Sequence, residues 1–315
     1  MAAGETRDGV ALTNLDDQLF EGAQATKRDL VDYLEAVADR IIPELADRPL
    51  SVIRVLGGRS FMQKNVPTYT PPWVRTVQVW AEASKREVSY ALCNDRATLV
   101  WFANQRAVEY HPTLVRADSW DRPSYLVLDL DPPEGVGFGS AVRAAHLVRH
   151  ALAESGLVGA VKTSGAKGVH VYVPMQEATT GEEVAAATRA LAVRAEQLDP
   201  DLATTAYVRN EREGKVFLDP TRSGGATVVA AYSPRVRPGA PVSFPMAWGD
   251  LDAVAPTDFT VRTAAALIAE GDAWADLLPE PQQLSSELVE EGRAIPVARV
   301  QAMHEGKRRA RERGV

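Results

Sequence analysis

Two aspartates separated by a single residue, Asp129 and Asp131, are the side chains with the clearest chemical potential. They end the apolar run Tyr125–Leu130 and precede Pro132-Pro133, which is typical of a strand that stops in a turn. Because side chains alternate across a strand, both carboxylates should point to one face, roughly 6–7 Å apart along it. Oxygen ligands of this type suit Mg²⁺ or Mn²⁺. The alternative is a pair of polar residues at a strand end, since isolated Asp-x-Asp patterns are common.

A second polar block, KTSGAKGVH, runs from Lys162 to His170. Its two glycines, three positions apart, can expose backbone N–H groups, and Ser164, Lys167 and His170 can add hydrogen bonds and charge. Together these groups could bind an anionic group such as a triphosphate. His170 taken alone would fit a purely structural histidine, so the prediction depends on the block as a whole.

A third carboxylate, Asp219, follows the short apolar run Lys215–Leu218 and precedes Arg222. Asp219 could complete a three-carboxylate metal site, and the guanidinium of Arg222 could neutralise phosphate. Taken singly, Asp219 would be a turn residue, and only the set favours an active site. The sequence contains no GxxxxGK[ST], HExxH or GxSxG motif, and the glycines at 135–139 lack the last glycine of GxGxxG.

The elements that would position these residues are helices alternating with short strands. Helices are predicted over residues 26–46, with Thr26 as N-cap, and over 98–108, 141–154 and 181–198. Strands are predicted over residues 50–56, 74–80, 88–92, 125–130, 158–163, 169–173 and 215–218. This alternation predicts an α/β or α+β fold. Residues 280–315 turn polar and charged and are expected to form an appended helical or flexible tail.

The composition is that of an ordinary globular protein of 315 residues, 45% hydrophobic and 24% charged. Its single cysteine, Cys93, excludes an intramolecular disulfide and a CxxC metal site. No segment approaches a signal peptide or a membrane span, so we expect a cytoplasmic protein without a membrane partner. The net charge of −7 neither supports nor excludes DNA, because basic residues gather at 209–237 and 307–313.

In its ordered blocks the sequence resembles the polymerase domain of bacterial ligase D and its stand-alone relatives in the archaeo-eukaryotic primase superfamily. The resemblance spans about residues 12 to 278 and is carried by these blocks: Leu12–Asn14, Arg48–Leu50, Phe61–Lys64, Val108–Pro112, Leu128–Pro133, Ser164–His170, Lys215–Asp219, Ala230–Arg235 and Asp258–Arg262. It implies an α+β, primase-like fold in which an N-terminal α/β module packs against an RRM-like catalytic sheet. The catalytic domain would cover residues 1–279, divided into modules at about 1–115 and 116–279.

The resemblance also implies a chemistry, the templated or end-directed addition of ribo- or deoxynucleotides to DNA at gaps or ends. Asp129, Asp131 and Asp219 would hold two Mn²⁺ or Mg²⁺ ions and act as the catalytic set. The other implied contacts are to the NTP or dNTP, from His111, Ser164, Lys167, His170, Arg222 and Arg235, and to DNA, from Lys27, Phe61 and Lys64.

The sequence departs from the family pattern where DNA is expected to bind. Asp17 stands where relatives usually carry a lysine for a downstream 5′-phosphate, although Lys27 matches a second such lysine. Phe61-Met62 replaces a pair of phenylalanines that stack on DNA in many relatives. We therefore expect a weaker dependence on the 5′-phosphate. No KxDG ligase signature occurs, so a stand-alone repair polymerase is expected, with any ligase or end-binding protein as a separate chain.

Two other functions fit parts of the pattern. Nucleotide-sugar glycosyltransferases also use Asp-x-Asp with Mn²⁺, but they need neither the strand ending at Asp219 nor the block Ser164–His170. A non-catalytic DNA-end-binding module has no need of three clustered carboxylates. The sequence leaves open the preference for NTP or dNTP, and the choice between de novo priming, gap filling and untemplated addition.

Overall fold

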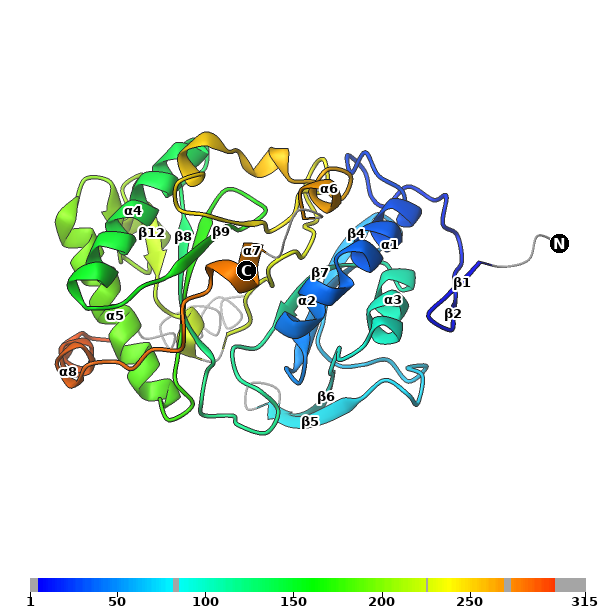
Figure 1. The fold of residues 1–315 in the computed structure, drawn as a ribbon, viewed down its shortest axis with the longest axis horizontal. Coiled ribbons are helices and arrows are strands. Elements are labelled where there is room, and N and C mark those ends of the chain that lie inside the picture. Colours follow the sequence, from blue (N-terminus) through cyan, green and yellow to red (C-terminus); the bar gives the residue numbers. More distant parts are fainter. Residues whose placement is uncertain (1–4, 82–84, 225, 269–272, 298–315) are drawn as a thin grey trace, which may run out of the picture.

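The chain builds two β-sheets, each with its own helices, as Figure 1 shows for this computed structural model. The structure describes residues 5–81, 85–224, 226–268 and 273–297. One sheet belongs to the N-terminal part of the chain, and the other contains the predicted aspartates. The candidate site depends on how these two sheets are joined.

Strand β3 (Leu50–Leu56) is the central strand of the N-terminal sheet. It runs antiparallel to β4 (Arg59–Gln63) and β7 (Ala107–Pro112), and its first residue meets β6 (Arg86–Ala91), which pairs with β5 (Thr76–Ala81). β3 occupies the residues predicted for it, because an apolar run ends at Gly57, whose φ of +55° suits glycine.

Helices α1 (Lys27–Ala36), α2 (Ala38–Leu45) and α3 (Arg96–Asn104) pack with this sheet. Thr26 is the N-cap of α1, as predicted, and forms a capping box with Asp29. The single helix predicted over 26–46 is divided at Val37, and Pro43 lies inside the second of the two helices, α2.

The helix predicted over 98–108 is wrong at its end. α3 stops at Asn104, and β7 begins at Ala107. Arg106 makes the turn between them with a φ of +60°, a conformation in which a non-glycine residue gives little signal in the sequence. This early stop is what places residues 107–112 in a strand.

The second sheet has the strand order β11-β12-β8-β10-β9-β13. Its pairs are antiparallel except β11 with β12. Helices α4 and α5 cover the face remote from the N-terminal sheet (Figure 1), which leaves the other face turned toward that sheet. The elements are β8 (Tyr125–Asp131), α4 (Phe138–Glu154), β9 (Ala160–Thr163), β10 (Val169–Pro174), α5 (Gly181–Leu198), β11 (Ala203–Thr204), β12 (Val216–Asp219) and β13 (Pro245–Met246).

The segment 226–246 joins the two sheets. Its Ala230 N–H donates to the carbonyl of Tyr110 in β7 at 3.0 Å. Further along, the carbonyl of Phe244 accepts from the N–H of Thr163 in β9 at 2.9 Å. The buried core continues through both sheets, so residues on β7 are held in place relative to the second sheet.

Helix α8 (Ser286–Ala294) lies within the segment expected as a tail, and it packs tightly on α5. A Cβ atom at Gly292 would lie 1.8 Å from the carbonyl oxygen of Ala186, so only glycine permits this approach. The remaining short elements are β1 (Thr6–Arg7), β2 (Val10–Ala11), α6 (Ala264–Ile268), α7 (Ala273–Leu277) and 3₁₀ turns at Arg209–Glu211, Arg222–Gly224, Leu251–Ala253 and Pro256–Asp258. Across the described part of the chain, every helix is too short or too polar to span a membrane.

Candidate active site

The register of the second sheet sets three predicted site residues in a row. Asp129 on β8 lies opposite His170 on β10 and opposite Asp219 on β12. Directly opposed residues of antiparallel strands share a face, so these three side chains point the same way. Asp131, two residues beyond Asp129, shares that face. The sheet therefore brings together the carboxylates that the sequence singled out.

Asp129 is the best-connected carboxylate of the row and is only 8% exposed. Its Oδ1 lies 3.2 Å from Nε2 of His170, and its Oδ2 accepts from Nε of Arg222 at 3.0 Å. Burial alone would raise the pKa of Asp129, but His170 and Arg222 outweigh burial and hold that pKa well below its usual range. Asp129 is therefore an ionised carboxylate in a nearly closed environment.

The other two aspartates differ in their surroundings. Oδ1 of Asp219 accepts from the N–H and the hydroxyl of Thr221, at 2.8 and 2.6 Å, and its Oδ2 lies 3.3 Å from Nη2 of Arg222. For Asp131, burial and then the charge of Asp129 raise the pKa. Negative charge thus accumulates around Asp131, while Arg222 neutralises part of the charge on its two neighbours.

The donor set fits a hard divalent cation, although the carboxylates are not gathered around one point. In the described residues, no group of three or more His, Cys, Asp or Glu side chains is arranged to hold a metal ion. Arg222 instead bridges Asp129 and Asp219. All three aspartates nonetheless offer oxygen from one sheet face, which Mg²⁺ and Mn²⁺ prefer. Burial and then the charge of Asp129 raise the pKa of Asp131, and a bound cation would offset both effects.

The turn between β9 and β10 holds Ser164 and the two glycines of the polar block. Oγ of Ser164 accepts from the N–H groups of Ala166 and Gly168, at 3.2 and 3.0 Å. A Cβ atom at Gly168 would lie 2.3 Å from the carbonyl oxygen of Leu130, and one at Gly165 would lie 2.7 Å from Cγ of Arg235. The glycines therefore have a packing role, since they let the turn approach β8 and Arg235.

Lys167 lies at the tip of the same turn, where its side chain is 40% exposed. Its Nζ is 3.5 Å from Oε1 of Glu134. Lys167 and Asp131 line a small pocket of about 180 Å³ together with basic residues of the loop before β12, namely Arg209, Arg212 and Lys215. This pocket adds positive charge at the exposed end of the carboxylate row.

A second cluster joins the two modules through Glu109, a residue that the sequence analysis did not single out. Glu109 is 3% exposed, and its Oε2 lies 2.8 Å from Nε2 of His111 and 3.0 Å from Nε of Arg235. Its Oε1 accepts from the N–H of Val236 at 2.8 Å. Arg235 also donates through Nη1 to the carbonyl of Ser164. The structure thus connects three predicted nucleotide-binding residues, His111, Arg235 and Ser164, through one buried carboxylate.

The net electrostatic effect on Glu109 favours its ionised form. Burial would raise the pKa of this carboxyl, but the hydrogen bond from His111 and the charge of Arg235 lower the pKa to about 2. For His111, burial lowers the pKa and outweighs the opposing effect of Glu109. The cluster is therefore an ionised carboxylate beside an imidazole and a guanidinium.

A second residue outside the predicted set, Lys162, is fully buried on β9. Its Nζ is 2.9 Å from Nδ1 of His170. The available signal for Lys162 in the sequence was a lysine within a short apolar strand just before the Ser164 turn. The sequence does not show that His170 is the partner of Lys162, because this contact depends on the pairing of β9 with β10.

The residues predicted to contact DNA lie on the N-terminal module, apart from the carboxylate row. Phe61, 42% exposed, and Lys64 are on the surface at β4, and Arg54 lies over the Phe61 ring at 5.8 Å. Lys27 is 2% exposed, and its Nζ donates to Oδ1 of Asn104 at 2.7 Å and to the carbonyl of Thr13.

Met62, the neighbour of Phe61, points to the other face of the N-terminal sheet. Met62 on β4 and Glu109 on β7 both lie opposite Ile53 on β3, so Met62 shares the face of the Glu109 cluster.

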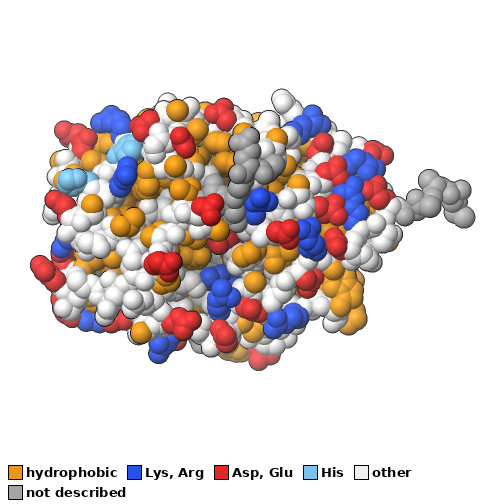
Figure 2. All heavy atoms as spheres, viewed as in Figure 1, with side chains coloured by type: hydrophobic (Ala, Val, Ile, Leu, Met, Phe, Trp, Pro, Cys, Tyr) orange, Lys and Arg blue, Asp and Glu red, His pale blue; other side chains and the backbone are white. Residues whose placement is uncertain are grey.

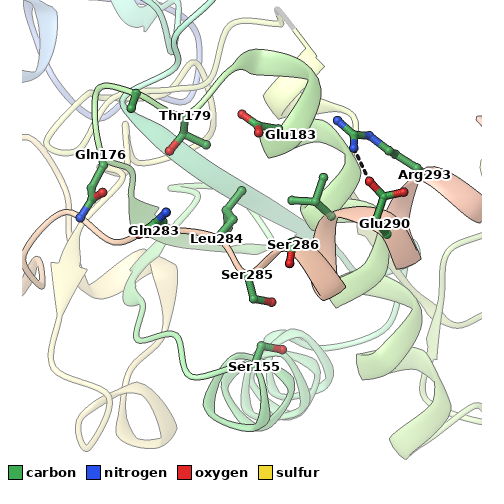
Figure 3. A pocket seen from close by; sticks show the side chains of 12 residues that line it. Ser155, Gln176, Thr179, Glu183, Gln283, Leu284, Ser285, Ser286, Glu290 and Arg293 are labelled. Atoms are coloured by element: carbon green, nitrogen blue, oxygen red, sulfur yellow. Dashed lines mark hydrogen bonds and ion pairs between the residues drawn. The ribbon is translucent and has the colours of Figure 1, made fainter.

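The surface charge is mixed. On the face shown in Figure 2, basic and acidic side chains of the described residues are interspersed. A separate polar pocket of about 630 Å³ lies between α5, α8 and the segment before α5 (Figure 3), and its lining contains none of the predicted site residues. The predicted site residues therefore lie outside this pocket.

Comparison with known proteins identifies the family. The family model described as "LigD, primase-polymerase domain" matches residues 26–274. The chain is 34% identical over 277 residues to the bifunctional non-homologous end joining protein LigD of Bacillus subtilis, covering 86% of this chain and 44% of that protein. It is also 34% identical over 263 residues to the multifunctional LigD of Mycobacterium tuberculosis H37Rv, covering 80% of this chain and 34% of that protein. The chain thus spans less than half the length of these relatives.

A solved structure gives the same answer for the fold. The polymerase domain from Mycobacterium tuberculosis ligase D, in complex with DNA, superposes with a TM-score of 0.78 at 31% identity. The match covers 85% of this chain and 97% of that chain. These matches confirm the predicted family, the α+β primase-like fold and, at the level of the family, an enzyme of the primase-polymerase class. The chain is therefore a member of the LigD primase-polymerase domain family.

Proposed function

We propose that this protein is a DNA-repair polymerase that adds ribo- or deoxynucleotides to primer ends or across short gaps and releases pyrophosphate. The observation that carries the proposal is the row Asp219–Asp129–His170 on three adjacent strands, with Asp131 on the same face. Such a row offers carboxylates for cations beside a histidine and an arginine for phosphate. A binding module would gain nothing from burying this concentration of charge.

Asp129, Asp131 and Asp219 would hold two Mn²⁺ or Mg²⁺ ions. When bound, these ions would supply the charge that favours ionisation of the primer 3′-hydroxyl and neutralises the triphosphate. Asp219, at the end of β12, would lie nearest the primer. A cation at Asp131 would offset the burial and the charge of Asp129, which both raise the pKa of this carboxyl.

The chain's own cations and hydrogen-bond donors would hold the incoming nucleotide. His170, Arg235 and the Ser164 turn would contact the triphosphate, with Lys167 and Arg222 beside it. His111 would lie at the sugar, fixed by Glu109. Because Glu109 also pairs with Arg235, one carboxylate would position both the residue at the sugar and a residue at the triphosphate. This preorganisation lowers the cost of ordering the site when the nucleotide binds.

DNA would be held on the N-terminal module through Phe61, Lys64 and Lys27. Phe61 offers an exposed ring for a base to stack upon, and Lys64 a charge for the backbone. Lys27 could reach a 5′-phosphate only by exchanging its contacts with Thr13 and Asn104, which supports a weak dependence on that phosphate. We place the enzyme in the cytoplasm, working with a ligase activity and an end-binding protein.

Extension of a labelled primer across a short DNA gap tests the proposal. Wild type, Asp129→Ala/Asp131→Ala and the exposed control Asp121→Ala would each be given Mn²⁺ and one NTP or dNTP at a time. We expect templated extension by wild type and the control, and a loss of at least about a thousandfold in the double variant. If all three proteins bind the gapped DNA and none extends the primer, a DNA-end-binding module becomes the better description.

A further inference from the structure

Lys162 is a buried charged side chain for which the proposed chemistry has so far no use. It is 0% exposed on β9, directly opposite His170 on β10. Burying an ammonium is costly unless hydrogen bonds replace its water. The partners of Lys162 therefore indicate what it does.

The Lys162 ammonium has three hydrogens and three partners. Nζ lies 2.9 Å from Nδ1 of His170, 3.0 Å from the carbonyl oxygen of Val229 and 2.6 Å from Oγ of Ser243. The carbonyl can only accept, and the Ser243 hydroxyl already donates to the carbonyl of Thr163 at 2.8 Å. Two of the three hydrogens are thus assigned, and the third points at Nδ1 of His170.

The opposite nitrogen of the His170 ring faces a group that only accepts. Nε2 lies 3.2 Å from Oδ1 of Asp129, a carboxylate whose Oδ2 accepts from Nε of Arg222. Nε2 must therefore carry a hydrogen, and in a neutral imidazole Nδ1 is then an acceptor. A donor at Lys162 and an acceptor at Asp129 select the same one of the two neutral tautomers.

The proton shared by this pair belongs on Lys162. The carbonyl of Val229 and the hydroxyl of Ser243 both face Nζ as acceptors, which suits an ammonium at this position. The ring of Tyr172, with its centroid 5.4 Å from Nζ, adds a favourable cation–π contact.

We propose that Lys162 is a positioning residue that donates to Nδ1 of His170 and so fixes the ring orientation in which Nε2–H faces Asp129. Nδ1 is held as an acceptor toward the interior, and the Nε2–H is presented on the carboxylate face. The inference rests on the proposed function only for its consequence, in which this N–H is the donor that meets the triphosphate. It concerns the orientation and hydrogen bonding of one neutral tautomer and involves no change of protonation.

The tautomer can be measured without nucleotide or activity. The chain has five histidines, so long-range ¹H–¹⁵N correlation spectra of protein labelled with ¹⁵N-histidine are tractable, and His170→Gln assigns the His170 signals. We expect the pattern of a single Nε2–H tautomer in wild type and in the control Lys85→Met, which changes an exposed lysine between β5 and β6. In Lys162→Met, which keeps the length but removes the donor, Asp129 still holds the Nε2–H, so the hydrogen should stay on Nε2 while the ¹⁵N shift of Nδ1 moves toward that of an unbonded ring nitrogen.

Nucleotide kinetics give a second readout. Partners that orient a functional histidine typically contribute about 10- to 100-fold, so KM for the nucleotide should rise by at least about tenfold in Lys162→Met. The affinity for gapped DNA should stay within about twofold. A wild-type spectrum showing hydrogen on Nδ1, a wild-type Nδ1 shift typical of an unbonded ring nitrogen, or an Nδ1 shift unchanged in Lys162→Met would overturn the inference. If that variant fails to fold, the wild-type Nδ1 shift alone decides, and it does so even if the protein extends no primer.

Discussion

Glu109→Gln is the substitution whose effect can be worked out most completely from the structure. It keeps the size of a 3%-exposed side chain and removes its charge. Arg235 then loses its carboxylate partner at 3.0 Å, and His111 meets either a weaker acceptor or an N–H group in place of Oε2. Both residues belong to the proposed nucleotide site, so stability and nucleotide binding should weaken together.

The magnitude follows from the lowered pKa of Glu109. Its folded-state value of about 2, against an ordinary value of 4.5, corresponds to about 3 kcal/mol of stabilisation. Because the folded pKa is depressed, this stabilisation is fully present above about pH 4.5 and is lost as the pH falls through about 2. Wild type and Glu109→Gln should therefore differ by about 3 kcal/mol at pH 7 and by about 2 kcal/mol at pH 3.5.

Urea denaturation followed by circular dichroism at pH 7, 5 and 3.5 gives this difference directly. The matched control is Glu177→Gln, an exposed carboxylate, which should match wild type within about 0.5 kcal/mol at each pH. A difference below about 1 kcal/mol at pH 7, or one that grows as the pH falls, would refute the reasoning. Nucleotide titration should show weaker binding in Glu109→Gln alone.

Three further predictions concern residues with different roles. Ser164→Ala leaves the N–H groups of Ala166 and Gly168 without their acceptor, so urea denaturation should show a loss of about 1–3 kcal/mol and the KM for nucleotide should rise. Lys27→Met should change the preference for a 5′-phosphate on gapped DNA by less than about threefold, measured by fluorescence anisotropy, because its amine donates inward. Gly292→Ala should lower the melting temperature by forcing α8 off α5, at about 1–3 kcal/mol, while primer extension remains at the wild-type rate.

Elements bounded by strong local signals could be predicted from the sequence. α5 occupies the residues expected, and a capping box formed by Thr180 and Glu183 marks its start. The boundary between helix α3 and strand β7 could not be predicted, because the apolar run continues across it. The turn between them requires Arg106 to adopt a positive φ. β4 was missed as a strand, since it carries exposed residues and depends on pairing with β3.

The same distinction applies to the candidate site. Asp129 and Asp131 follow from strand alternation alone, and the pairing of their strand with β12 brings Asp219 beside them. Glu109 and Lys162 were missed because their importance lies in partners far along the chain. Glu109 binds the N–H of Val236, 127 residues away, and Lys162 binds Ser243, 81 residues away. No local pattern encodes such pairs.

The row of opposed side chains also has a consequence for how the gene can change length. Lys162, His170, Asp129 and Asp219 occupy opposed positions on four neighbouring strands. One codon inserted or deleted within β8 would turn Asp129 into the helix-covered core and bring a leucine to the open face, because alternation inverts every position beyond the change. Length variation should therefore collect in the connections at 132–137 and 205–215, while these strands accept only substitutions.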